Sequence, residues 1–203
     1  MMKKIFFTLT IFLIMGFNSY ALTPMESIKQ PTENIISILK ADKYQTLTPE
    51  LREEQWGEIW EVVKNSFEFT IISRLSVGKY WSSFSLEEKK EFQDVFAKLL
   101  ANTYIDKVQE NFKNQEVKYI DEKISDKKAE VMVHVALADN DVPIIYRMLD
   151  NNGWLIYDVR IEGMSMIKNY RSQFDEFLFK KSPKELIEAL DSKINQLREE
   201  RKK

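Results

Sequence analysis

The amino-acid sequence predicts an α+β domain in which helices pack on one face of a curved, four-stranded antiparallel sheet. Apolar residues recur at helical spacing before residue 114 and after residue 163, whereas between these positions they alternate with polar residues. The alternating segments are joined by short turns, which is typical of an antiparallel meander. Helices that cover one face of such a sheet define the α+β class.

The N-terminal half predicts three shorter helices and one long helix. The shorter helices are expected near residues 32–41, 49–65 and 71–75. Because proline disrupts a helix interior, Pro31 is expected just ahead of the first helix. The long helix begins at Ser85 and Glu88, which have the spacing of a capping box. Its wide apolar stripe consists of Phe92, Val95, Phe96, Leu99, Leu100, Thr103, Tyr104 and Val108.

Four strands follow in the alternating part of the chain. They are expected near residues 117–123, 129–137, 142–148 and 154–161. The odd-numbered residues of the second strand form one aliphatic face, and those of the fourth, from Leu155 to Ile161, are expected on one apolar face. A sheet with such a face, roofed by an aromatic-rich helix, encloses either a packed core or a cavity, and periodicity does not separate the two.

The C-terminal part predicts two further helices. Gly163 ends the fourth strand at a sharp turn, and a helix is expected from there to about Lys180. The segment 182–185 caps a final helix. Residues 193–203 mix positive and negative charges, so we expect a solvated, fraying helix end.

The N-terminus has the pattern of a secretory signal peptide. Lys3 and Lys4 precede an apolar run from Ile5 to Phe17, and small residues lead up to Ala21. The apolar run is about 13 residues long, short of the roughly 20 that a membrane-spanning helix needs. We therefore expect a signal peptide over residues 1–21, cleaved after Ala21, and a single domain over residues 22–203.

Composition excludes several classes of function. The chain has no cysteine, which excludes disulfides and thiol catalysis. It carries 30 basic and 32 acidic side chains, and loss of Lys3 and Lys4 with the signal peptide leaves 28 basic ones, a net charge of about −4. Nucleic acid is an unfavourable partner for such a chain, because phosphate binding needs a concentrated basic face. Five glycines offer no phosphate-cradling loop.

Few residues suggest catalysis. His134 is the only histidine, no cluster has metal-ligand spacing, and no serine lies in a nucleophile elbow, so we expect no metal, no cofactor and no enzyme activity. Asp158 fits a structural hydrogen-bonding role better than an acid–base role. For Arg171 the charge favours an ion pair with Glu162 or Asp158, and the alternative is contact with an anionic ligand head group.

A block near the end of the predicted sheet resembles the MlaC family, also known as the toluene-tolerance family. It contains Asp-Val at 158–159, Ile-Glu-Gly at 161–163, and Asn-Tyr-Arg-Ser-Gln-Phe at 169–174. Two upstream features also resemble the family pattern. They are Gly78 with Trp81, and the Thr-Tyr pair at the end of the long helix. The sequence departs from the family pattern at Glu68, where aspartate is expected. The resemblance covers nearly all of the chain after residue 21.

The resemblance implies a monomeric periplasmic phospholipid carrier with a fold similar to nuclear transport factor 2 and a deep apolar cavity. Such carriers exchange lipid between an outer-membrane lipoprotein–porin complex and an inner-membrane ABC transporter with an MCE-domain subunit. This is the Mla pathway, which maintains outer-membrane lipid asymmetry. The physics agrees, because each methylene group moved out of water is worth about 0.8 kcal/mol, so acyl chains need an apolar lining in transit.

The residues expected to contact lipid follow from strand and helix phase. The acyl-chain lining is expected to comprise Trp81, Phe96, Leu100, Tyr104, Val133, Val135, Tyr146, Met148, Tyr157 and Val159. Met164, Met166 and Tyr170 are expected at the mouth.

Two other classes of protein remain open from the residues alone. One is a small enzyme on the same fold that uses Asp158 with Tyr146 or Tyr157 as an acid–base pair. The other is a periplasmic interaction module with a filled core and no lipid. Phospholipid that co-purifies with the protein would separate the carrier from both.

Overall fold

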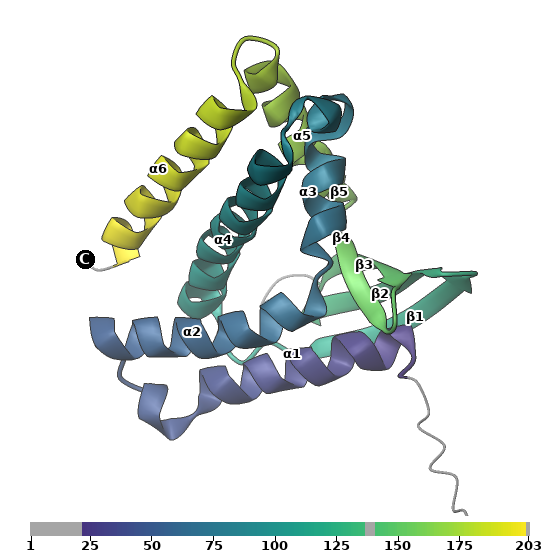
Figure 1. Cartoon of the computed structure of the whole chain (residues 1–203). Coiled ribbons are helices and arrows are strands. Elements are labelled where there is room, and N and C mark those ends of the chain that lie inside the picture. Colours follow the sequence, from purple (N-terminus) through teal and green to yellow (C-terminus); the bar gives the residue numbers. More distant parts are fainter. Residues whose placement is uncertain (1–21, 137–140, 202–203) are drawn as a thin grey trace, which may run out of the picture.

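The computed structural model describes residues 22–136 and 141–201, and it consists of helices packed against an antiparallel sheet (Figure 1). The predicted fold class is confirmed. The expected signal peptide, and Leu137 at the end of the second predicted strand, lie outside the described residues. Among the described residues, no helix is long and apolar enough to cross a membrane.

The helices and strands follow the predicted order. The α-helices are α1 (Pro24–Lys40), α2 (Pro49–Ser66), α3 (Phe69–Val77), α4 (Leu86–Asn111), α5 (Met166–Leu178) and α6 (Pro183–Arg201). Two 3-10 helices are η1 (Asp42–Tyr44) and η2 (Gly78–Ser83). The strands are β1 (Val117–Ser125), β2 (Lys128–Ala136), β3 (Asp141–Asp150), β4 (Trp154–Ile161) and β5 (Met164–Ser165).

The sheet has five strands in the order β1-β2-β3-β4-β5, one more than predicted. The additional strand is short, and it pairs antiparallel with the end of β4, where Ile161 lies opposite Met164. Glu162 and Gly163 connect the two strands with φ angles of 49° and 81°. Two central residues with positive φ are what a tight two-residue hairpin requires, so the glycine allows β5 to form.

A β-bulge in β4 changes which side chains face inward. Arg147 on β3 pairs with Asp158, but the next residue, Met148, pairs with Ile156, so Tyr157 is the extra residue. Because a bulge shifts the alternation by one position, Ile156 and Val159 share a face. The prediction that the odd-numbered residues from Leu155 to Ile161 all lie on one face is therefore wrong.

Helix α1 packs across the sheet and starts earlier than predicted (Figure 1). Thr23 and Glu26 form a capping box at its first turn, and Pro24 occupies a first-turn position that tolerates proline. The expectation that the helix begins at Thr32 is wrong, and Pro31 lies inside it. Burial of α1 against the sheet offsets the proline: Ile28 packs with a cluster that includes Ala129, Val131, Val133, Met148 and Ile156.

Helices α3, α4, α5 and α6 enclose a core rich in aromatic rings. Phe96 on α4 lies 5.2 Å from Phe174 and 5.0 Å from Tyr170, both on α5, measured between ring centroids. Phe92 lies 5.4 Å from Phe96 and 5.3 Å from Phe84. Phe92 and Phe96 are stacked and the other three pairs meet edge to face, and both arrangements are typical of favourable aromatic pairs. We call the set Phe84, Phe92, Phe96, Tyr170 and Phe174 the aromatic core.

The end of α6 is anchored rather than frayed, which corrects the sequence-based expectation. Arg201 is only 8% exposed and donates hydrogen bonds to Asn102 on α4 and to Glu53 on α2. Its guanidinium also lies 2.8 Å from a carboxylate oxygen of Asp106 and 4.8 Å from the centroid of the Trp56 ring. A single side chain therefore ties α6 to both α2 and α4.

Replacement of this arginine should destabilise the fold. Arg201→Ala leaves the half-buried Asp106 without its ion-pair partner, and loss of one member of a buried pair typically costs about 3 kcal/mol. We expect a fall of that size in the free energy of unfolding, measured by chemical denaturation. The exposed Arg198 on the same helix is the control, and Arg198→Ala should change stability by less than about 0.5 kcal/mol. Equal effects of the two changes would contradict the anchoring role.

Candidate functional site

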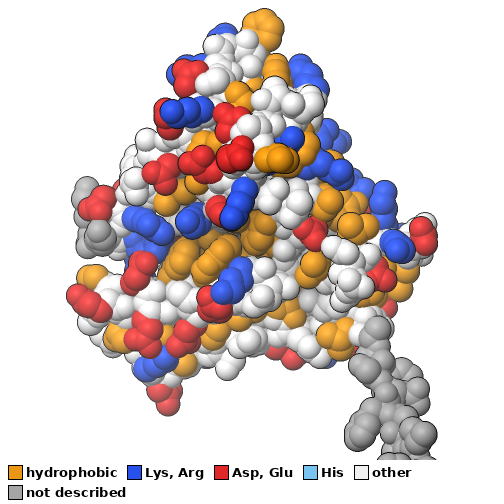
Figure 2. Space-filling view, viewed as in Figure 1, with side chains coloured by type: hydrophobic (Ala, Val, Ile, Leu, Met, Phe, Trp, Pro, Cys, Tyr) orange, Lys and Arg blue, Asp and Glu red, His pale blue; other side chains and the backbone are white. Residues whose placement is uncertain are grey.

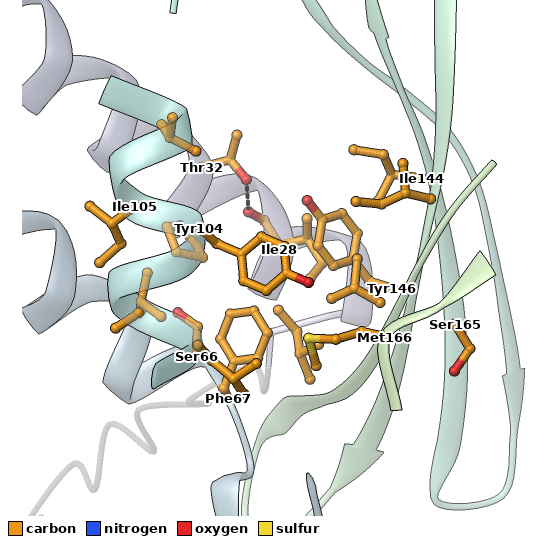
Figure 3. Close-up of a pocket in the computed structure, with 18 of the residues that line it drawn as sticks. Ile28, Thr32, Ser66, Phe67, Tyr104, Ile105, Ile144, Tyr146, Ser165 and Met166 are labelled. Atoms are coloured by element: carbon orange, nitrogen blue, oxygen red, sulfur yellow. Dashed lines mark hydrogen bonds between the residues drawn. The ribbon is translucent and has the colours of Figure 1, made fainter. Parts of the chain in front are cut away.

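An apolar cavity of about 830 Å³ lies between the helices and the sheet (Figure 3). On the helical side it is lined by Ile28, Pro31, Thr32 and Ile35 of α1, Ile59, Val63 and Ser66 of α2, and Leu100, Ala101, Tyr104, Ile105 and Val108 of α4. Phe67 and Phe69 complete this side. On the sheet side it is lined by Ile144, Tyr146, Ile156, Val159 and Ile161. The volume is in the range typical of sites for small molecules and cofactors.

The turn from β4 into α5 forms one edge of the cavity. Lining residues that are also exposed mark the opening, and we call Val108, Ile161 and Met164 the mouth. Met164 is 71% exposed although it is apolar. Among the described residues that line the cavity, Lys168, on the first turn of α5, is the one that carries a charge.

A second hollow, of about 220 Å³, lies on the surface between α2 and α4. Trp60, Phe69 and Ala97 line it together with charged residues such as Lys64 and Asp94. Figure 2 shows hydrophobic side chains gathered above α2, with acidic and basic side chains around them. Its small size and charged rim make it a poorer candidate site than the main cavity.

Six of the predicted lipid-contacting residues line the cavity. These are Leu100, Tyr104, Tyr146, Val159, Met164 and Met166. They come from α4, from β3 and β4, and from the segment after Gly163, which the structure brings together around one space. As lipid contacts these residues remain predictions.

The other seven lie outside the lining. They are Trp81, Phe96, Val133, Val135, Met148, Tyr157 and Tyr170. Their roles as lipid contacts also remain predictions.

The reasons for these seven positions differ. Phe96 and Tyr170 belong to the aromatic core, and Trp81 stacks on Phe84 at 5.9 Å. Val133 and Met148 are buried beneath α1, while Val135 lies further along β2 and pairs with Val117 and Val142. The bulge turns Tyr157 toward the helical core, where the Arg147 guanidinium covers its ring at 5.2 Å.

The contributions of α1 and α2 to the lining were not predicted. Ile28 and Ile35 are seven residues apart, and Ile59 and Val63 are four apart, so each pair shares a helix face. That spacing was visible in the sequence. It identifies an inward face, but it does not show whether the face meets a packed core or an open cavity.

Asp158 holds the strand-to-helix corner in place. It is 2% exposed, and its carboxylate accepts hydrogen bonds from the Ser165 hydroxyl at 2.8 Å and the Ile167 backbone N–H at 3.1 Å. The Ser165 hydroxyl oxygen in turn accepts from the Lys168 backbone N–H at 3.1 Å and so caps α5. The negative charge also lies at the positive end of the helix dipole. Asp158 therefore has the structural hydrogen-bonding role that the sequence favoured.

Arg171 does not form either of the expected ion pairs. Its Nε donates a hydrogen bond to the backbone carbonyl of Leu75 at 2.6 Å, near the end of α3. Gly78, with φ of 53°, lies beneath it, and a Cβ at this glycine would be 3.5 Å from the arginine Nε. The arginine therefore joins α5 to the end of α3, and it does not line the cavity.

The remaining polar candidates show no catalytic arrangement. His134 lies on β2 between its register partners Lys118 and Pro143. Across residues 22–136 and 141–201, no group of three or more histidine, aspartate or glutamate side chains could hold a metal ion.

The fold and the cavity together define an α+β protein built around an apolar chamber that opens beside a strand-to-helix turn. Its sequence matches the family model described as MlaC protein over residues 29–192. The chain therefore belongs to the MlaC family, as the sequence block at 158–174 indicated. No curated protein matches the chain in sequence.

A solved structure has a similar fold. It is that of a phospholipid-binding protein from Ralstonia solanacearum in complex with a phospholipid. The two chains are 25% identical, with a TM-score of 0.74, and the match covers 87% of this chain and 99% of the other.

Removal of the Asp158 charge should loosen the corner without emptying the cavity. In Asp158→Asn the amide cannot accept as many hydrogen bonds as the carboxylate, and loss of a charge-assisted bond typically costs about 2 kcal/mol. We expect that decrease in the free energy of unfolding, with unchanged retention of any bound lipid at a temperature where the variant is folded. Asp191→Asn, on an exposed part of α6, is the control. Unchanged stability would contradict the structural role of Asp158.

Proposed function

We propose that this protein is a periplasmic phospholipid carrier that moves lipid between the two membranes of the cell envelope. The observation that carries the proposal is the apolar cavity of about 830 Å³, which opens beside the cationic side chain of Lys168. Membership of the MlaC family and similarity to a phospholipid-bound protein support phospholipid as the ligand.

The capacity of the cavity suits the two chains of one lipid. A methylene group fills about 30 Å³, similar to the share of one water molecule in the liquid. A volume of about 830 Å³ therefore holds two chains of roughly 14 carbons. Longer chains would project through the mouth or require the walls to move apart.

The lining makes lipid exchange nearly neutral in free energy. Moving a methylene group from water into an apolar site yields about 0.8 kcal/mol, so chains exposed to water pay a large penalty. Isoleucine, valine and methionine side chains in the cavity resemble the bilayer interior in polarity. The difference in free energy between a lipid bound in the protein and the same lipid in a membrane is therefore small. A carrier with this lining can both take up lipid and release it.

The head group is placed at the mouth by charge. Lys168 is exposed there, next to the polar side chains of Asn169 and Ser172, which also line the cavity. An ammonium group at this position attracts a phosphate oxygen. Arg171, considered for this role from the sequence, contacts the Leu75 carbonyl instead.

The cellular setting of the proposal comes from the family and the N-terminal sequence. We propose that residues 1–21 are a cleaved signal peptide and residues 22–203 a single lipid-binding domain in the periplasm. The partners in this proposal are an outer-membrane lipoprotein–porin complex and an inner-membrane ABC transporter with an MCE-domain subunit. Family membership supports these partners.

The surroundings of Asp158, the acidic residue considered for catalysis, agree with a binding role for the protein. Both carboxylate oxygens of Asp158 accept hydrogen bonds from Ser165 or Ile167, and the group is buried away from solvent. An acid–base pair of Asp158 with Tyr146 or Tyr157 would need a carboxylate that is free to exchange a proton with a substrate.

Partial filling of the cavity should weaken lipid binding. Val63 lines the cavity, and in Val63→Trp the larger side chain displaces about three methylene groups, worth about 2 kcal/mol, so lipid affinity should fall roughly thirtyfold. Native mass spectrometry of the purified mature protein measures lipid occupancy directly.

The adjacent Val62 provides a matched control for this test. It lies on the same helix but does not line the cavity, so Val62→Trp should leave occupancy near that of the wild type. The absence of any co-purifying or added phospholipid from the folded wild-type protein would overturn the proposed function.

A further inference from the structure

Two tyrosine side chains project into the cavity, Tyr104 from α4 and Tyr146 from β3. Building on the proposed function, we propose that Tyr104 and Tyr146 donate hydrogen bonds to the ester carbonyl oxygens of the bound lipid. The cavity then selects two-chain lipids with ester linkages over otherwise identical lipids with ether linkages.

The depth of Tyr146 follows from its place on β3. Ile144, two residues before it, pairs with Ile161 at the mouth, while Met148, two residues after it, is fully buried. Two residues of a strand span about 6.6 Å. The Tyr146 ring therefore stands one step inside the opening.

Tyr104 lies at a corresponding depth on the opposite wall. It is one helical turn from Val108 at the mouth, and one turn in the other direction leads to Leu100, deeper in the cavity. A turn of α-helix rises about 5.4 Å. Figure 3 shows the rings of Tyr104 and Tyr146 projecting into the cavity from α4 and from the sheet.

The Tyr146 hydroxyl has no hydrogen-bond partner among the described residues. It faces the cavity, and burial raises its pKa to about 12, so it remains protonated at neutral pH. Burial also raises the pKa of Tyr104, and the nearby Tyr170 hydroxyl partly offsets that rise. Both groups are therefore hydrogen-bond donors under physiological conditions.

The other hydroxyls of α1 and α2 in the lining are already engaged. Thr32 donates to the Ile28 carbonyl at 2.7 Å, and Ser66 donates to the Val62 carbonyl at 2.9 Å. These bonds lie within the helices and use the hydroxyl protons. Tyr104 on α4 and Tyr146 on β3, in contrast, can donate a hydrogen bond to a ligand in this part of the cavity.

The chemistry of a phospholipid matches this arrangement. A phosphate at Lys168 places the glycerol at the mouth and the two ester carbonyls a few bonds further in. Once acyl chains displace water, a hydroxyl without a partner is penalised, and a carbonyl oxygen is a good acceptor in an apolar site. An ether linkage lacks the carbonyl oxygen and offers the donors only its less accessible ether oxygen, so the hydrogen bonds are weaker.

The test compares two phospholipids that differ only in linkage. Dimyristoyl phosphatidylglycerol and its ditetradecyl ether analogue are mixed in equal amounts in vesicles, and native mass spectrometry gives the ratio of the two lipids bound to the mature protein. We expect the wild type to favour the diester about five- to tenfold, the range expected for one or two neutral hydrogen bonds. Tyr146→Phe should bring the ratio toward one, and Tyr104→Phe should lower it.

Tyr119 supplies the matched control. Its hydroxyl is also buried without a hydrogen bond, but the residue does not line the cavity, so Tyr119→Phe should keep the wild-type ratio. Circular dichroism checks that each variant is folded. Equal binding of the two lipids by the wild type, or a preference that survives both Tyr146→Phe and Tyr104→Phe, would overturn this inference and leave the carrier proposal intact. Binding of neither lipid would overturn the carrier proposal itself.

Discussion

The bulge at Tyr157 is the constraint on which the arrangement of the site depends. One extra residue in β4 places Ile156 and Val159 on the cavity side and turns Tyr157 and Asp158 toward the helices. Asp158 can then bind the first turn of α5 through Ser165 and Ile167. Without the shift in alternation, the buried carboxylate would face the apolar cavity, and the start of α5 would lose its partner.

The molecule divides its apolar residues between a filled region and an empty one. Between α4 and α5, large rings are packed together, and Phe174 meets Phe92 and Phe96 edge to face. Between α1, α2 and the sheet, branched aliphatic side chains together with a few aromatic rings line an open volume. The dense region limits the cavity on one side, because close-packed rings resist displacement.

Signals within a few residues of one another predicted most of the fold. The capping box at Ser85 and Glu88 marked the start of α4, and turn residues marked the ends of the strands. The bulge has no such local signature, because it depends on pairing between β3 and β4. Pro31 was predicted to precede the first helix but lies inside it, because burial of α1 against the sheet outweighs the low helix propensity of proline. The helical and strand periodicity of the sequence identified Tyr104 and Tyr146 as inward-facing residues, and both line the cavity. Periodicity could not distinguish Phe96, which lies in a packed core, from Leu100, which lies beside the cavity.

Arg201 connects the cavity to a part of the chain that does not line it. It binds Glu53 and Trp56 on α2 and Asn102 and Asp106 on α4, and these are the two helices that carry Val63 and Tyr104. The last turn of α6 therefore adds a link between α2 and α4, which also contact each other directly through Arg52 and Glu110. During synthesis, which proceeds from the N-terminus, both helices emerge well before the side chain that links them. A chain interrupted ahead of α6 would carry every described lining residue and still lack this link between α2 and α4.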